Sequence, residues 1–213
     1  MTRYYRDETG MYIDWDQLEK LPEIDTLIDI GVGPMGTPIL YSQFAEANLL
    51  LIDPLDETKI YIDENLVGRQ VKWYQCGVGE KTDEVIINVE EKIGRSSILN
   101  VADINYEGEP VDKRKINIKT LDSITSSEEN LGRLGIKIDT EGYEMSIILG
   151  ASETLKTTEF VLAEVRHNHE SFEGVYKLHE FMGVMQDNDF VLTMILTAKP
   201  FIADLCFQRK STL

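Results

Sequence analysis

The stretch from residue 26 to residue 36 constrains the fold most strongly, because apolar residues give way abruptly to glycines. Leu27 to Ile30 is apolar except for Asp29, and a G-x-G-x-x-G spacing begins at Gly31. A helix-like stretch follows from Thr37 to Ala47. This order predicts a strand, a tight turn and a helix N-terminus. Glycine permits positive φ and lets a ligand lie against bare backbone. Outward-pointing amides at such a turn would suit an anionic group.

Asp29 indicates what kind of ligand this turn would take. Its carboxylate precedes the first glycine by two residues, where it would repel a pyrophosphate. It can instead accept hydrogen bonds from a ligand's ammonium group, so a ligand with both a carboxylate and an ammonium would suit the turn. The glycine spacing also matches the dinucleotide fingerprint, and an ordinary strand-to-helix turn is a further alternative.

Apolar strands and amphipathic helices alternate along the rest of the chain. Continuous apolar runs such as Leu49 to Ile52 are typical of a parallel sheet that is covered on both faces. Strands are expected at 27–30, 49–53, 71–76, 134–139, 160–166, 190–196 and 203–208, and helices at 37–47, 57–67, 145–155 and 175–187. The alternation predicts a doubly wound α/β sheet that binds ligands at the carboxyl ends of its strands. The last two strands, joined around Pro200, are expected to be antiparallel.

A length of 213 residues suits one domain with small additions. We expect residues 1–25 to form an extension, with a short helix from Trp15 to Leu21, that could act as a lid. Residues 26–213 would form the main domain. Residues 84–118 change pattern and predict an inserted β-structure, with a mobile segment at about 91–113.

Composition restricts the partners and the compartment. There are 38 acidic and 21 basic side chains, a net charge of −17, and such a surface repels nucleic-acid phosphates. No apolar run approaches the roughly 18 residues of a membrane span, and the polar N-terminus lacks a signal-peptide core. We therefore expect a cytoplasmic protein without a nucleic-acid partner. Cys76 and Cys206 are far apart, which favours buried free thiols over a disulfide.

Polar residues and glycines follow several of the predicted strands. Asp53 comes 17 residues after Gly36, where an acid at the end of a second strand would meet ribose hydroxyls. A solvated or capping aspartate is the alternative. The turn Cys76-Gly77-Val78 should reach the base of such a ligand, unless it is a plain turn.

Several segments together resemble one family, the FkbM-type S-adenosylmethionine-dependent methyltransferases. The resemblance runs in collinear order over roughly residues 25–208, and its most specific part is Lys-Ile-Asp-x-Glu-Gly-x-Glu at 137–144. The segments that carry it are IDIGVG (28–33), IDP (52–54), GRSSIL (94–99), IKTLDSI (118–124), IKIDTEGYE (136–144), LGA (149–151) and VLAEV (161–165).

The resemblance implies a Rossmann-like, mostly parallel seven-stranded sheet and S-adenosylmethionine as the cofactor. It implies methyl transfer to an oxygen, often a sugar hydroxyl of a glycan or a hydroxyl of a secondary metabolite. Ser97 would lie beside the cofactor or cover it. The other cofactor-binding residues implied are Asp29, Gly31, Val32 and Gly33 for the methionine part, Asp53 with Pro54 for the ribose, and Cys76, Gly77 and Val78 for the adenine.

Methyl transfer to a hydroxyl requires a group that removes the hydroxyl proton. Asp139 and Glu164 follow neighbouring predicted strands, and His167 is attractive because an unperturbed imidazole titrates near neutral pH. The alternatives are a helix-capping role for Asp139, with Glu141 or Glu144 as other possible caps, and a surface position for His167. A divalent ion held by Asp139 and Glu164 would also lower the acceptor pKa, but two carboxylates do not establish a metal site.

Two other classes of function compete with methyl transfer. An NAD(P)-dependent oxidoreductase would explain the glycine spacing, but Asp29, the motif at 137–144 and the short chain without a separate substrate domain oppose it. A non-catalytic binding module on a methyltransferase fold is the second alternative. The expected partner is a small-molecule or glycan acceptor, and the sequence leaves its identity and the oligomeric state open.

Overall fold

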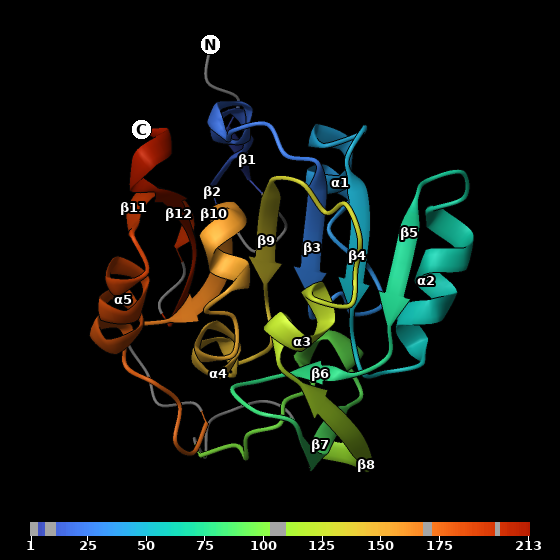
Figure 1. Ribbon diagram of the computed structural model, residues 1–213. Helices are drawn as coiled ribbons and strands as arrows, with labels where there is room; N and C mark the ends of the chain where they lie inside the picture. The colour runs from blue at the N-terminus through green and yellow to red at the C-terminus, as the bar shows by residue number, and fades with distance from the viewer. Residues whose placement is uncertain (1–3, 7–11, 103–109, 168–171, 199–200) are drawn as a thin grey trace.

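A mostly parallel sheet forms the centre of the molecule (Figure 1). The computed structural model describes residues 4–6, 12–102, 110–167, 172–198 and 201–213. Within these residues the main sheet has seven strands, and β12 runs antiparallel to both of its neighbours. In sheet order the strands are β11 (Phe190–Ala198), β12 (Ile202–Arg209), β10 (Thr158–Arg166), β9 (Leu134–Ile138), β3 (Thr26–Ile30), β4 (Asn48–Ile52) and β5 (Val71–Tyr74). The predicted doubly wound sheet and its antiparallel C-terminal pair are confirmed.

Helices cover both faces of this sheet. Alternate residues of the central strands enter different cores, so that Ile28 packs with one helical layer and Leu27 with the other. Burial on both faces explains why strands such as β4 are continuously apolar. The first layer contains α3 (Leu121–Thr125), α4 (Glu144–Leu149) and α5 (Leu178–Asp187), and the second contains α1 (Pro38–Gln43), α2 (Glu57–Asn65) and the 3-10 helix η1 (Trp15–Lys20). Two further 3-10 helices are η3 (Thr154–Thr157) and η4 (Lys210–Thr212).

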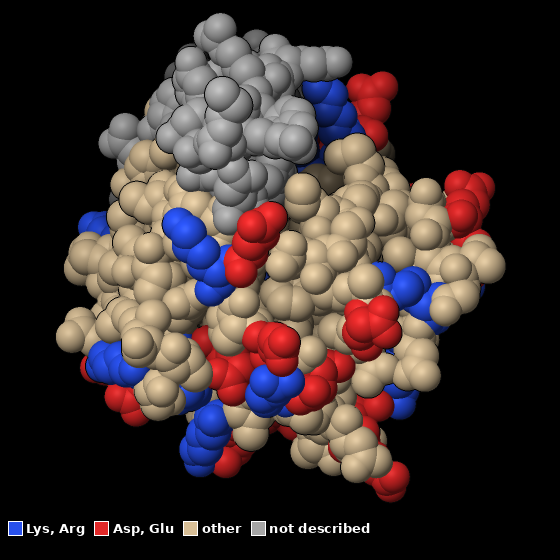
Figure 2. All heavy atoms as spheres, turned by 90° about the horizontal axis from the view of Figure 1, so that it is seen from above, with Lys and Arg blue, Asp and Glu red and all other residues tan. Residues whose placement is uncertain are grey.

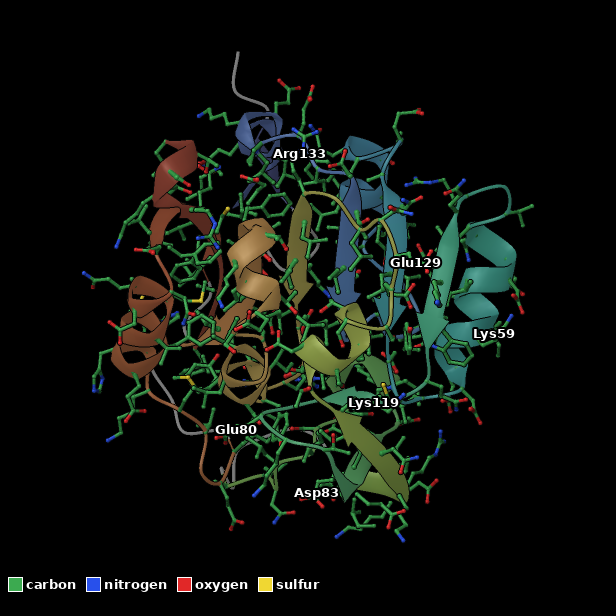
Figure 3. All side chains as sticks on the ribbon, in the orientation of Figure 1. Lys59, Glu80, Asp83, Lys119, Glu129 and Arg133 are labelled. Atoms are coloured by element: carbon green, nitrogen blue, oxygen red, sulfur yellow. The ribbon has the colours of Figure 1, made fainter. Side chains whose placement is uncertain are left out.

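A small three-stranded sheet lies beyond the carboxyl ends of β3, β4 and β9 (Figure 1). It has the order β6-β8-β7, and its elements are β6 (Gly77–Val78), β7 (Asp83–Glu90), the 3-10 helix η2 (Ile93–Arg95) and β8 (Pro110–Lys119). Asp83 and Lys119 mark this end of the molecule, opposite to Arg133 (Figure 3). The predicted β insertion is confirmed. Residues 103–109 of the segment predicted to be mobile lie outside the described residues.

Helix α1 ends at Gln43, although the sequence predicts a helix as far as Ala47. The guanidinium of Arg69 donates hydrogen bonds to the carbonyl oxygens of Tyr41, Phe44 and Ala47 at 2.8–3.1 Å. Of these three carbonyls, only that of Tyr41 would be bonded inside a helix that ends at Ala47, because the last four carbonyls of a helix have no internal partner. A distant arginine therefore takes over one bond of the predicted last turn and binds two carbonyls beyond the observed helix.

The N-terminal extension packs against one side of the domain. Its described part begins with two antiparallel strands that the sequence did not predict, β1 (Tyr4–Arg6) and β2 (Tyr12–Asp14). Helix η1 confirms the short predicted helix and packs against α1 and β11. Its Leu18 is buried and borders a cavity beside residues 31–37. Whether the extension moves as a lid stays a prediction.

Other predictions from composition concern the cysteines and the surface. Cys76 and Cys206 are both buried free thiols, as predicted. None of the helices built from the described residues combines the length and the apolarity that crossing a membrane requires. On the face seen in Figure 2, basic side chains lie among acidic ones.

The strand end at Gly31 generates a prediction about stability. Gly31 has φ +80°, and a Cβ there would lie 1.8 Å from the carbonyl oxygen of Asp139. Gly68 has φ +84° but no atom within 4 Å of such a Cβ, so it is a matched control. We expect Gly68→Ala to lose about 1–2 kcal/mol from strain alone, and Gly31→Ala to lose more than about 3 kcal/mol because the backbone must also shift. Urea unfolding measures both, and equal losses would contradict the steric role of Gly31.

Candidate functional site

The glycine turn, residues 31–36 between β3 and α1, forms the centre of the candidate site. Gly31, Gly33 and Gly36 all have positive φ, from +57° to +80°, which explains why glycine occupies these positions. Their amides donate within the chain, to the Ile52 carbonyl at 2.9 Å, the Asp53 carboxylate at 2.8 Å and the Val32 carbonyl at 3.1 Å respectively. The prediction that the amides of these glycines point outward to an anionic ligand is therefore wrong.

Asp29 is fully buried beneath this turn. Its Oδ2 accepts hydrogen bonds from the Thr37 hydroxyl at 2.9 Å and the Tyr41 hydroxyl at 2.6 Å. Its Oδ1 lies 3.3 Å from Nζ of Lys137, the residue directly beside it on β9. The predicted contact with a ligand's ammonium is thus replaced in this structure by an internal ion pair.

Lys137 is a site residue that the sequence analysis missed. Its side chain is 14% exposed, and Nζ donates to the Gly31 carbonyl at 3.2 Å and lies 3.6 Å from the Asp139 carboxylate. Burial opposes its charge, but Asp29 and Asp139 outweigh this and hold the Lys137 pKa above its ordinary value. The signal was present, because Lys137 is the one charged residue in the apolar strand β9.

Asp53 follows β4 and holds the glycine turn in place. Its two carboxylate oxygens accept hydrogen bonds from the amides of Gly33 and Leu55, each at 2.8 Å. Burial raises the pKa of Asp53, and these amides oppose the shift. A carboxylate oxygen can accept more than one hydrogen bond, so the predicted contact with a ribose stays open.

A narrow cavity of about 70 Å³ lies between the ends of β4 and β5 and residues 93–98 of the insertion. Its lining includes the residues predicted to hold the adenosine part, namely Asp53, Pro54, Cys76, Gly77 and Val78. The structure therefore brings these predicted residues together. Burial raises the pKa of the Cys76 thiol, which favours its neutral form.

Residues 93–98 cover the glycine turn from the side of the insertion. A Cβ on Gly33 would lie 3.7 Å from the α-carbon of Gly94. Ser97 is buried, and its hydroxyl donates to the Glu141 carbonyl at 2.8 Å. Ser97 thus fastens this segment to the loop after β9, and Ser96 rather than Ser97 borders the narrow cavity.

A wide cavity of about 480 Å³ opens on the other side of the turn. It is bordered by the glycine turn, by η1 and α1 through Leu18 and Leu40, by the ends of β9, β10 and β11, and by the start of β12. Val32, Lys137, Asp139 and Glu164 all line it. Asp139 and the glycines 31, 33 and 94 are the described residues that border both cavities.

Three carboxylates converge where β9 and β10 end. Asp139, Glu141 and Glu164 each place one oxygen within 4.8 Å of the others. Glu141 also forms an ion pair with Arg166, and its backbone has φ +54°, which is unusual for a residue with a side chain. Burial raises the Glu141 pKa to about 7, although Arg166 opposes the shift. The sequence placed all three residues at these strand ends, but it gave a catalytic role only to Asp139 and Glu164 and offered Glu141 as a possible cap.

Glu144 holds the loop that carries Glu141. Its Oε1 accepts hydrogen bonds from the amides of Thr140 and Gly142 and from the Thr140 hydroxyl, each at 3.0 Å. Its Oε2 accepts one from the Tyr176 hydroxyl at 2.9 Å. Glu144 therefore satisfies amides of the loop before α4, whereas the N-cap position of α4 is Tyr143 and has no side-chain cap, so the predicted helix cap is not formed.

His167 borders a different cavity from Asp139 and Glu164. It borders a third cavity of about 930 Å³, beside α5 and β11, together with Arg166 and Tyr176. It is absent from the described lining of the narrow and wide cavities. In the loop after β10, residues 168–171 lie outside the described residues.

Comparison with known proteins identifies the family. The family described as the Methyltransferase FkbM domain matches residues 38–192, which is more than half of the chain. The chain belongs to the FkbM methyltransferase family. The resemblance seen in the sequence is thereby confirmed. No protein of curated function matches the chain.

Solved structures of FkbM and related methyltransferases share the Rossmann-like fold. The crystal structure of Methyltransferase FkbM from Methylobacillus flagellatus KT is similar, with a TM-score of 0.54 and 17% identity, over 87% of this chain and 44% of that chain. An O-methyltransferase family protein from Burkholderia thailandensis has a TM-score of 0.50 and 11% identity, over 92% and 55% of the two chains. A putative S-adenosylmethionine dependent methyltransferase from Listeria monocytogenes has a TM-score of 0.50 and 10% identity, over 92% and 97%. The present chain thus spans less than half the length of the Methylobacillus protein.

The buried Glu141 should make stability depend on pH. Its pKa of about 7 in the folded chain exceeds its ordinary value of 4.5, so the folded state binds the proton more tightly between these pH values. The contribution of this group to stability therefore falls as pH rises from 4.5 to 7, by up to about 3 kcal/mol. Glu141→Gln cannot titrate, and we expect its stability to fall less steeply over the same window. Urea unfolding of both proteins from pH 4.5 to 8 checks this, and parallel curves would count against the raised pKa.

Proposed function

We propose that the protein is an S-adenosylmethionine-dependent O-methyltransferase that acts on a hydroxyl of a sugar, glycan or secondary metabolite. The observation that supports this best is the position of Asp139. It borders both the narrow and the wide cavity, and its side chain is 34% exposed. A carboxylate at this junction is placed between a donor held along the glycine turn and an acceptor in the wide cavity.

The residues around the turn fit this cofactor. Gly33 and Gly94 face each other with bare backbone, and both border the narrow and the wide cavity. Asp53 and the Cys76 to Val78 turn border the adenosine side, while Val32 and Asp139 border the methionine side. The excess of carboxylates suits a sulfonium cation. The narrow cavity is smaller than an adenosine, so binding would require residues 93–98 to move away from the turn.

S-Adenosylmethionine, when bound, supplies a methyl group whose bond to the sulfonium sulfur breaks as the acceptor oxygen attacks, the electron pair staying on sulfur. The chain must align the two reactants and take up the hydroxyl proton. We propose that the Asp139 carboxylate accepts this proton, with Glu164 orienting the acceptor. His167 was the other candidate base, and its position beside the third cavity favours the carboxylates.

The same carboxylates raise the question of a metal. Asp139, Glu141 and Glu164 have the oxygen ligands that Mg²⁺ prefers. However, Lys137 lies 3.6 Å from Asp139, and Arg166 is paired with Glu141. A divalent cation would have to compete with these two fixed positive charges, so we propose that the reaction proceeds without a metal.

The lining of the wide cavity favours a neutral, hydroxyl-rich acceptor. Thr197, Asp204 and Glu164 offer polar groups along one wall, and Leu162 and Leu196 offer apolar surface beside them. Carboxylates accept hydrogen bonds from sugar hydroxyls but repel phosphate groups. A polyol or sugar therefore fits this cavity better than a heavily phosphorylated compound.

Substitution of Asp139 tests the proposed function. We expect Asp139→Ala to reduce turnover at least about 100-fold, the scale of a lost general base, while calorimetry still shows binding of S-adenosylhomocysteine. Wild-type protein should bind S-adenosylhomocysteine and not NAD. His167→Ala should keep most of the activity. Binding of NAD alone would support an oxidoreductase instead. Cofactor binding without turnover on a broad hydroxyl panel would support a non-catalytic module.

Chelation tests the proposal of a metal-free reaction. We expect turnover to be unchanged after incubation with EDTA, because the positive charges of Lys137 and Arg166 lie beside two of the carboxylates and would oppose a cation there. The measurement is the initial rate with and without EDTA. Loss of activity that added Mg²⁺ restores would contradict this proposal and favour the metal-assisted alternative.

A further inference from the structure

The glycine turn leaves the carboxylate of a bound methionine group without an obvious partner. The amides of Gly31, Gly33 and Gly36 are all used inside the chain, one of them by the Asp53 carboxylate. Helix α1 has only six residues, so its uncapped first turn offers only a weak dipole to an anion. A cation from elsewhere in the site would therefore strengthen the binding of a ligand's carboxylate.

Lys137 is the basic side chain that can meet this need. Among the described residues that line the narrow and wide cavities, it is the single lysine, arginine or histidine. Its Nζ lies against the carbonyl of Gly31, on the same turn that the methionine part of the cofactor would follow. We infer that Lys137 binds the carboxylate of the methionine group, an inference that rests on the proposed function.

The groups around Lys137 keep its ammonium group charged and hold it beside the glycine turn. It pairs with Asp29 at 3.3 Å and Gly31 at 3.2 Å, while Asp139 lies farther away at 3.6 Å. An ammonium has three N–H donors, so the two closer contacts leave one donor for the cavity. Because Asp29 and Asp139 raise the Lys137 pKa, the group stays protonated and acts as a binding cation rather than as a base.

This arrangement gives Asp29 a different role from the one that the sequence suggested. Its carboxylate is held by Thr37 and Tyr41 on one oxygen and faces Lys137 with the other. Asp29 has no exposed surface, so it acts on the ligand through the ammonium of Lys137. It is a positioning residue, and Lys137 is the binding residue.

A thermodynamic cycle between protein and ligand tests this assignment. Calorimetry would measure the Kd of S-adenosylhomocysteine and of its decarboxylated analogue, which keeps the ammonium group. Wild-type protein is compared with Asp29→Asn/Lys137→Met, which removes both members of the buried pair and so leaves no unpaired buried charge. We expect decarboxylation to weaken binding to wild type about tenfold or more, and to the double variant by less than about twofold.

The matched control is Lys59→Met/Asp63→Asn, the same two substitutions in an exposed ion pair on α2 (Figure 3 labels Lys59). It should respond to decarboxylation as wild type does. Lys137→Arg should keep part of the wild-type response, because it keeps the charge.

Each outcome bears on a different claim. An equal loss on decarboxylation in wild type and in Asp29→Asn/Lys137→Met would overturn the role of Lys137. Tighter binding of both ligands by that variant would overturn it too, because Lys137 would then compete with the ligand's ammonium. If the variant does not fold, a wild-type ratio near one still refutes the inference. Failure of wild type to bind S-adenosylhomocysteine at all would refute the proposed function instead.

Discussion

The candidate site depends on the close approach of two parallel strand ends. Gly31, at the end of β3, lies so near the carbonyl of Asp139 that a Cβ would come within 1.8 Å of it. The amide of Asp139 donates to the Ile30 carbonyl at 3.0 Å, so the strands stay paired to their last residues. This contact lets Lys137 reach the turn from the neighbouring strand and places Asp139 between the two cavities. The missing side chain of Gly31 thus allows the short distance between the ends of β3 and β9, on which both binding and chemistry would depend.

The order of strands and helices could be predicted because its signals are local. The apolar run of β3, the glycines after it and the acid after β4 each lie within a few residues of one another. Helix lengths were less predictable, since distant side chains decide where the helices end. Arg69 binds carbonyls in and just beyond the last turn of α1, and Asp122 binds the amides of Glu153 and Thr154 after α4. Arg69 lies outside α1 and Asp122 lies outside α4, so neither helix end could be predicted from the sequence of the helix itself.

The site was predicted in outline and not in its internal contacts. Sequence placed acids at the ends of two neighbouring strands, and the structure brings Asp139 and Glu164 together there. The partner of Asp29 could not be read from the sequence, because it depends on the register between β3 and β9. The roles of Glu141 and Glu144 depend on a left-handed residue in their loop, which turns one carboxylate into the site and the other onto the loop amides. The different roles of these two glutamates cannot be predicted from their residue type alone.

The insertion leaves and rejoins the domain at neighbouring points. Gly77 and Ile118 are register partners in the pairing of β6 with β8, so the chain returns to the place from which it departed. An excursion closed in this way can lengthen, shorten or exchange residues without altering the order of the seven main strands. The insertion can therefore change in sequence and length during evolution while the seven-stranded sheet keeps its topology.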